Sequence, residues 1–352
     1  MSTTTSREVT RYSKRKLNNG QEIPVAGFGV YAISKRNTFD LVYEALVQGY
    51  RHIDNAVLYG NEKEAAQAVE QFVNDSNGKV KRSDIWYTTK IYDGDHGYER
   101  TRAGVEAIAG RVKEHIGYVD LVLVHSPLSN REKRLGTWKA LQEYQGDPGN
   151  GTLQINSIGV SNYGIRHLEE LFSWEGYKVK PVLNQLELHP WLPHIELRKY
   201  LEKHDIEAEA YSPLTQGYNL DDPELLALEK KYKVSKIEIL LKWSYLQGFI
   251  VLAKTGKKER VKQNLEVLPE TGVVQLDEGI VRALDKPGSK ESFVWGVDPA
   301  SPLSGHQAWK VVWKASEGDE GAIESSTGPF QAARPGRSSG RRSEATRGFQ
   351  EA

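Results

Sequence analysis

Eight short apolar or β-branched runs, each followed by a segment of helical periodicity, constrain the fold of this chain most strongly. The runs are VAGFGV, YRHIDN, IWYTTK, VDLVLVH, NSIGVS, PVLNQLEL, IEAEAYS and FIVLAK. Candidate helices lie between or after them at residues 38–48, 62–74, 98–115, 131–144, 166–174, 195–204, 223–232 and 257–265. Strands that alternate with helices in this way predict parallel βαβ units. Eight such units in 352 residues favour a (β/α)8 TIM barrel over an open doubly wound sheet.

The positions of the polar residues support the barrel. A polar residue stands at or just past the end of most runs: Asp54, Lys90, His125, Ser161 with Asn162, Ser212 and Lys254. In a barrel all of these ends meet on one face, which is the face where such folds carry out catalysis. In an open sheet only the few at the switch point would meet.

The two ends of the chain differ in character from this middle part. Asn19-Gly20 between two short runs predicts a β-hairpin with a type I′ turn ahead of the barrel. We expect residues 1–13 to be a flexible N-terminus and residues 14–299 to form the barrel. Residues 300–352 are rich in Gly, Ser, Arg and Ala without periodicity, which predicts a disordered tail.

Composition excludes several classes of function. The formal net charge is +0, so no overall field draws the chain to nucleic acid or to an anionic membrane. There is no cysteine, which rules out disulfides, thiolate metal sites and cysteine nucleophiles. His189 and His194 have no metal-ligand spacing, so we expect no metal. Without a leader or an apolar span, the chain reads as a cytoplasmic protein, a monomer or weak homodimer with a small-molecule substrate.

Four of the polar residues suggest proton-transfer chemistry. If the second, third and fourth strands are neighbours, Asp54, Lys90 and His125 converge, with Tyr59 on the loop above them. A buried lysine needs a partner, and Asp54 is the obvious one. An ammonium beside a phenol lowers the phenol's pKa, which would make Tyr59 a general acid. His125 could orient a carbonyl group.

Each of these residues also has a purely structural interpretation. Asp54 and Lys90 could be satisfied rim residues, Tyr59 could pack at a helix start, and His125 could be a core histidine. The two glycines of GFGVYA lack the third glycine of a Rossmann fingerprint and suggest tight packing instead. The functional interpretation rests on the joint occurrence of four such residues at consecutive strand ends.

The motifs GFGVY, RHIDNAVLYGNEKE, TTKI, VDLVLVHSP, SIGVSNYG, NQLELHPW, YSPL and LAKTGKKERVKQN together resemble the aldo-keto reductase superfamily from about residue 17 to residue 299. The resemblance implies a TIM barrel that transfers hydride between NADPH and an aldehyde or ketone. It implies that Asp54, Tyr59, Lys90 and His125 are the catalytic tetrad.

The same resemblance implies a set of cofactor-binding residues. Ser161, Asn162 and Gln185 would bind the nicotinamide carboxamide, and Tyr211 would stack on its ring. Further along the cofactor, the matching positions are Ser212 and Leu214 at the pyrophosphate, Lys254, Thr255 and Arg260 at the 2′-phosphate, and Gln263 and Asn264 at the adenine. Arginine and lysine near a helix N-terminus suit a phosphate group on physical grounds as well.

Loop positions suggest Tyr31, Tyr92, Ser126 and Trp191 for the substrate pocket. A rival interpretation is an NADP(H)-binding regulatory or interaction protein on the same barrel with little turnover, because a fold alone does not decide function.

Overall fold

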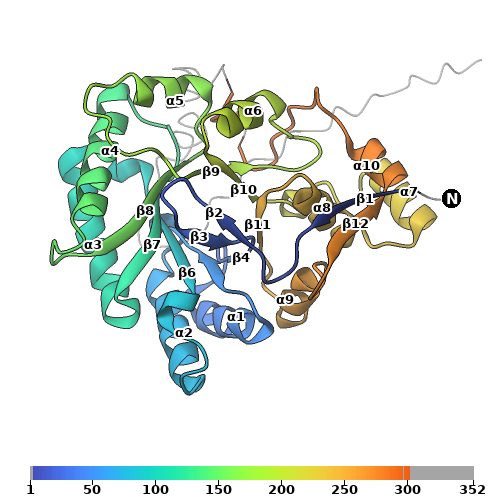
Figure 1. The fold of residues 1–352 in the computed structure, drawn as a ribbon, viewed down its shortest axis with the longest axis horizontal. Helices are drawn as coiled ribbons and strands as arrows, with labels where there is room; N and C mark the ends of the chain where they lie inside the picture. Colours follow the sequence, from blue (N-terminus) through green and yellow to red (C-terminus); the bar gives the residue numbers. More distant parts are fainter. Residues whose placement is uncertain (1–2, 296, 302–352) are drawn as a thin grey trace, which may run out of the picture.

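The computed structural model describes residues 3–295 and 297–301, and its centre is a closed barrel of eight parallel strands (Figure 1). The barrel strands are β4 (Ala26–Gly29), β5 (His52–Asp54), β6 (Trp86–Ile91), β7 (Tyr118–Val124), β8 (Gln154–Ser161), β9 (Leu183–Glu187), β10 (Glu207–Tyr211) and β11 (Ile250–Ala253). The sheet closes where β11 pairs with β4, with Val251 opposite Ala26. The predicted (β/α)8 barrel is therefore confirmed, and the open sheet is excluded.

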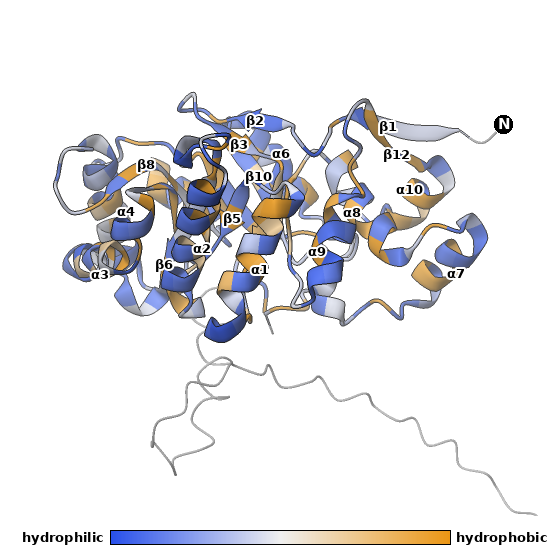
Figure 2. Ribbon diagram, turned by 90° about the horizontal axis from the view of Figure 1, so that it is seen from below, coloured by the Kyte–Doolittle hydropathy of each residue, from blue (hydrophilic) through white to orange (hydrophobic). Residues whose placement is uncertain are grey.

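Helices surround the barrel (Figure 1). They are α1 (Lys35–Gln48), α2 (Glu62–Asp75), α3 (Tyr98–Ile116), α4 (Arg131–Gly146), α5 (Ile165–Phe172), α6 (Ile195–Lys203), α7 (Pro223–Tyr232), α8 (Lys236–Leu246), α9 (Lys258–Leu265) and α10 (Glu278–Leu284). In α1 the buried residues are Thr38, Leu41, Val42, Ala45 and Leu46, a spacing of three and four that forms one stripe. Figure 2 shows the resulting mixture of apolar and polar residues along the helices.

The predicted helices all exist, but α8 and α10 were missed. α8 reads KIEILLKWSYL, and its buried residues include Ile239, Leu240 and Leu241 in succession. A helix buried on most of its circumference has no polar face, so the 3.6-residue period disappears from its sequence. Two helices, α7 and α8, connect β10 to β11, where the sequence predicted only the first of them. Asp222 caps α7 and Pro223 opens it, as the sequence indicates.

A hairpin closes the end of the barrel at which the strands begin. β2 (Lys14–Lys16) pairs with β3 (Glu22–Pro24). Leu17 and Ile23 from the hairpin pack on Trp86, Val182 and Ile250, which lie at the starts of barrel strands. Of the turn residues only Gly20 has a positive φ, +85°, so the predicted type I′ turn is wrong. The loop is the three-residue kind, in which a glycine follows a β-turn.

Residues 4–8 form a paired strand, contrary to the prediction that residues 1–13 are flexible. Residues Thr4–Glu8 form β1, which pairs antiparallel with β12 (Val273–Asp277) at the edge of the molecule (Figure 1). This strand has no partner near it in sequence. Its order depends on a contact between the two ends of the fold, which local periodicity does not reveal.

The last described residues pack on the barrel. His194 Nε2 lies 3.6 Å from Asp298 Oδ2. The Ala300 carbonyl oxygen packs so closely on Gly164 that a Cβ atom at residue 164 would lie only 2.1 Å from it. Ala300 is buried, so the barrel contacts extend slightly beyond the predicted boundary at residue 299. Most of the predicted disordered tail, residues 302–352, lies outside the described residues. Within the described part of the chain, no helix is long and apolar enough to span a membrane.

Candidate active site

Lys90 is the centre of a buried polar cluster at the carboxyl ends of β5, β6 and β7. Its side chain is fully buried, and its Nζ donates to Asp54 Oδ1 at 2.7 Å and to Oδ2 at 2.8 Å. Nζ also donates to the Asn55 carbonyl at 2.7 Å and to Tyr59 Oη at 3.4 Å. The desolvation cost of burying an ammonium is offset only when it is paired and hydrogen-bonded in this way. Asp54, Tyr59 and Lys90 are therefore brought together as predicted.

Tyr59 ends the short 3-10 helix η1 (Val57–Tyr59), and its ring lies between two aromatic neighbours. Its ring centroid is 5.1 Å from that of Tyr31 and 5.8 Å from that of His125. Burial raises the pKa of Tyr59 well above its ordinary value of 10, and Asp54, Tyr31 and Glu209 act in the same direction. The predicted lowering of this pKa is wrong, because desolvation outweighs the nearby ammonium. Tyr59 is thus a neutral phenol at neutral pH and still has its proton to give.

His125 follows β7 directly and is held neutral. Burial lowers its pKa well below 6.5, and the positive charge of Lys90 and the proximity of His96 lower it further. Within the described residues its Nδ1 is buried without a hydrogen-bond partner. A neutral imidazole can donate one hydrogen bond, and beside Tyr59 that donor suits a carbonyl oxygen.

Three predicted nicotinamide residues form one connected network with Tyr211. Asn162 Nδ2 donates to the His125 carbonyl and to Ser161 Oγ, both at 3.0 Å, and Tyr211 Oη donates to Asn162 Oδ1 at 2.8 Å. Gln185 Nε2 donates to Asp54 Oδ1 at 2.8 Å. The predicted nicotinamide residues and the tetrad are therefore in hydrogen-bonded contact.

The remaining predicted cofactor residues lie at the ends of β10 and β11. Ser212 follows β10 with a φ of +50°, and its carbonyl accepts from Thr215 N, one residue past Leu214. Lys254 follows β11, and its Nζ donates to the Ala32 carbonyl at 3.4 Å. Thr255 Oγ1 accepts from Lys257 N just before α9. On α9, Arg260 and Gln263 are exposed and Asn264 is buried.

A model of the family described as Aldo/keto reductase matches residues 25–285, which contain every one of these groups. The chain belongs to the aldo/keto reductase family. It is 39% identical over 280 residues to an uncharacterized oxidoreductase of Saccharomyces cerevisiae, covering 80% of this chain and 96% of that protein. It is 34% identical over 272 residues to a glyoxal reductase of Bacillus subtilis, covering 76% of this chain and 92% of that protein.

A solved structure of an aldo/keto reductase from Brucella melitensis matches with a TM-score of 0.67 and 36% identity. That match covers 79% of this chain and 99% of the Brucella chain. As an aldo/keto reductase, the protein is an oxidoreductase of a family that reduces carbonyl compounds and uses nicotinamide cofactors.

The four predicted pocket residues of this aldo/keto reductase differ in their exposure. Tyr31 is 38% exposed and packs beside Tyr59, and Tyr92 is 39% exposed in the loop after β6. Ser126 is buried, and its hydroxyl donates to Asp93 Oδ1 at 2.8 Å. Trp191 is 4% exposed and packs on Phe293, so it offers a ligand little surface.

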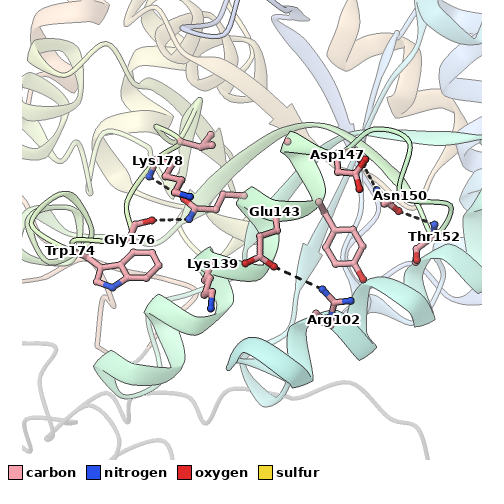
Figure 3. Close-up of a pocket in the computed structure, with 13 residues that line it drawn as sticks. Arg102, Lys139, Glu143, Asp147, Asn150, Thr152, Trp174, Gly176 and Lys178 are labelled. Carbon is pink, nitrogen blue, oxygen red and sulfur yellow. Dashed lines mark hydrogen bonds and ion pairs between the residues drawn. The ribbon is translucent and has the colours of Figure 1, made fainter.

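A groove of about 760 Å³ lies elsewhere on the reductase and contains none of the predicted residues (Figure 3). It lies beside α3, α4 and residues 174–179, and Arg102 lies opposite Glu143 within it (Figure 3). The groove is on the flank of the barrel, and none of the four predicted catalytic residues lines it.

Sequence reasoning missed three residues that contact the site. Glu209 Oε2 accepts from Gln185 Nε2 at 2.7 Å, and His52 lies next to Glu209 inside the barrel. Trp295 Nε1 donates to Tyr211 Oη at 2.7 Å. An acidic residue inside the run IEAEAYS is a signal that could have identified Glu209. No local signal marks Trp295, because its contact depends on how the C-terminal segment returns to the barrel.

Proposed function

We propose that this aldo/keto reductase carries out the NADPH-dependent reduction of an aldehyde or ketone to an alcohol. The observation that carries the proposal is the hydrogen bond from the buried Lys90 ammonium to the Tyr59 oxygen. Because the oxygen accepts this bond, the phenolic proton is free to point at a substrate oxygen. A protein that only bound the cofactor would have no use for this arrangement.

The residues that would hold the cofactor fit it. The amide nitrogen of Gln185 donates to carboxyl oxygens of Asp54 and Glu209, which leaves the Gln185 carbonyl oxygen to accept from a carboxamide. Lys254, Lys257, Lys258 and Arg260 are exposed around the start of α9, and no salt bridge involves Arg260 among the described residues. Free cations at a helix N-terminus suit a phosphate group, which distinguishes NADPH from NADH.

NADPH, when bound, supplies the hydride for the carbonyl carbon. Tyr59 gives its proton to the carbonyl oxygen, which becomes the alcohol. Lys90 then stabilises the phenolate that remains, and Asp54 holds Lys90 in place through both carboxylate oxygens. His125 donates a hydrogen bond that orients the carbonyl. The same residues acting in reverse would oxidise an alcohol.

The test is NADPH consumption across a panel of aldoses, aromatic aldehydes, keto acids and dicarbonyls, with Tyr59→Phe as the matched variant. Dicarbonyls belong in the panel because one relative is named glyoxal reductase. We expect turnover that Tyr59→Phe lowers by about 10²- to 10⁴-fold, the usual worth of a general acid, while NADPH still binds. Tight NADPH binding without turnover on any compound would instead support the regulatory interpretation.

A further inference from the structure

A second buried carboxyl group lies inside the barrel, one side chain away from the tetrad. We propose that Glu209 is a positioning residue for the proposed reduction, on which this inference rests: it is a neutral carboxylic acid that lies beside His52 and, through Gln185, holds Asp54 in place. Glu209 is fully buried on β10, and its hydrogen bond to Gln185 connects it with the predicted nicotinamide site. No hydrogen bond found in the described residues joins Glu209 to Tyr59.

Gln185 links the two acidic groups across the barrel. Its Nε2 donates to Asp54 Oδ1 at 2.8 Å and to Glu209 Oε2 at 2.7 Å, so both amide hydrogens are engaged. β9 pairs directly with β10, with Gln185 opposite Glu209, whereas β5 lies across the barrel from β9. Glu209 therefore accepts the second amide hydrogen of Gln185 while the first is donated to Asp54, which holds the Gln185 side chain at both ends of the bridge.

The hydrogen bonds around His52 indicate where a proton lies. His52 Nδ1 is 3.2 Å from the Pro24 carbonyl, which can only accept, so Nδ1 carries the ring hydrogen. Nε2 then has a lone pair, and it lies 3.6 Å from Glu209 Oε1 and 3.4 Å from Thr88 Oγ1. Glu209 Oε1 is buried and has no hydrogen-bond partner within 3.5 Å in the described part of the chain. Thr88 Oγ1 accepts from Trp86 Nε1 at 3.1 Å, so its own proton can be donated to that lone pair. Glu209 Oε1 thus faces a neutral imidazole and has no donor among the described residues that would stabilise a negative charge on it.

The charges that face Glu209 favour the same protonation state. The charged groups that face Glu209 are Asp54 from β5 and Lys90 from β6. His52 from β5 and Gln185 from β9 also face it, and both are neutral. Lys90 already pairs with Asp54, so an ionised Glu209 would be a second anion without a cation of its own. Burial, with Asp54, raises the pKa of Glu209 from 4.5 to about 8, and burial lowers the pKa of His52 to about 4.

The protonation state matters for Tyr59. A negative charge on Glu209 raises the pKa of Tyr59. It would also attract the ammonium of Lys90, which otherwise has Asp54 as its counter-ion. A neutral Glu209 leaves Asp54 as the one counter-ion of Lys90, with its orientation set by Gln185. Glu209 therefore acts on the reaction through Gln185 and Asp54 and does not itself contact a reacting atom.

The first experiment compares kcat as a function of pH for the wild-type protein, Glu209→Gln, Glu209→Ala and Glu207→Gln. We expect Glu209→Ala to lower kcat at pH 7 about tenfold, because Gln185 loses an acceptor. Glu209→Gln rescues kcat, since its amide oxygen still accepts from Gln185 and the side chain remains neutral. The wild-type kcat falls as Glu209 ionises near pH 8, and Glu209→Gln lacks this fall. Glu207 is on the same strand but pairs with Arg15 at the surface, so Glu207→Gln keeps the wild-type profile.

Two outcomes of this experiment would overturn the proposal. If Glu209→Gln loses as much kcat as Glu209→Ala, then the reaction needs a charged Glu209. If Glu209→Ala matches the wild type at every pH, then Glu209 positions nothing.

The second experiment does not depend on turnover, so it separates failure of this inference from failure of the proposed function. The infrared difference spectrum between wild type and Glu209→Gln at pH 7 should contain the C=O stretching band of a protonated carboxylic acid. A carboxylate band in its place would show that Glu209 is ionised and would overturn the proposal, whatever the enzyme reduces.

Discussion

At the scale of single residues, desolvation decides the chemistry of this site. Burial raises the pKa of Tyr59 and lowers the pKa of His125, and both shifts favour the neutral form of the side chain. Each residue nevertheless lies close to a charged group. Lys90 remains buried because four acceptor atoms surround its ammonium. The site therefore confines its charge to one ion pair, and the groups that would meet a substrate are neutral donors.

Asp93 gives a residue-scale prediction about stability. Burial raises its pKa from 3.8 to about 6, although Ser126 Oγ donates to it. Between these two pH values the folded protein keeps a proton that the unfolded chain has released, so rising pH stabilises the unfolded chain relative to the folded protein. We expect the free energy of unfolding of wild type, relative to Asp93→Asn, to be highest below pH 3.8 and to fall as the pH rises to about 6. Urea unfolding of both proteins at several pH values measures this, and parallel curves would contradict it.

At the scale of secondary-structure elements, the function of each strand end depends on the residue placed there. Asp54 ends β5 and His125 follows β7, while Lys90 lies one residue before the end of β6. These positions were predictable because an apolar run that stops at a polar residue marks a strand end. The start of α9 was predictable from its helical periodicity, which begins a short loop after β11.

The cations at α9 give an element-scale prediction. If Arg260 binds the 2′-phosphate, Arg260→Ala should weaken NADPH binding about 10- to 100-fold, which corresponds to losing roughly 1.5–3 kcal/mol of charged hydrogen bonding. NADH has no 2′-phosphate, so its affinity should stay nearly constant. Fluorescence titration measures both affinities. Lys262→Ala is the matched control, because Lys262 is on the same helix and pairs with Glu266; an equal loss for NADPH and NADH would remove the assignment.

At the scale of the whole molecule, the two ends of the barrel have different tasks. The hairpin of β2 and β3 covers the end where the strands begin (Figure 2). The tetrad lies at the opposite end, where β5, β6 and β7 finish. A TIM barrel separates stability from catalysis in this way, because its core is filled by side chains and its active site is built on the loops at one face.

Ile23 tests this separation. It is fully buried in the cluster that closes the hairpin end. Ile23→Ala should lower the free energy of unfolding by about 2–5 kcal/mol through lost burial and a residual cavity. At a temperature where the variant is folded, kcat should equal that of wild type. Denaturant unfolding and steady-state kinetics measure the two quantities, with the exposed Lys16→Ala on the same hairpin as control; a large fall in kcat would show that the two ends are coupled.

The sequence by itself determined the eight strand and helix units and the residues at the strand ends, because both depend on local periodicity and on where an apolar run stops. It did not determine the pairing of β1 with β12, the bridge from Glu209 through Gln185 to Asp54, or the contact of Trp295 with Tyr211. These contacts join residues far apart along the chain, and they exist only once the sheet closes and the C-terminal segment folds back. The pKa of Tyr59 belongs with them, because its sign depends on how much water the closed barrel excludes.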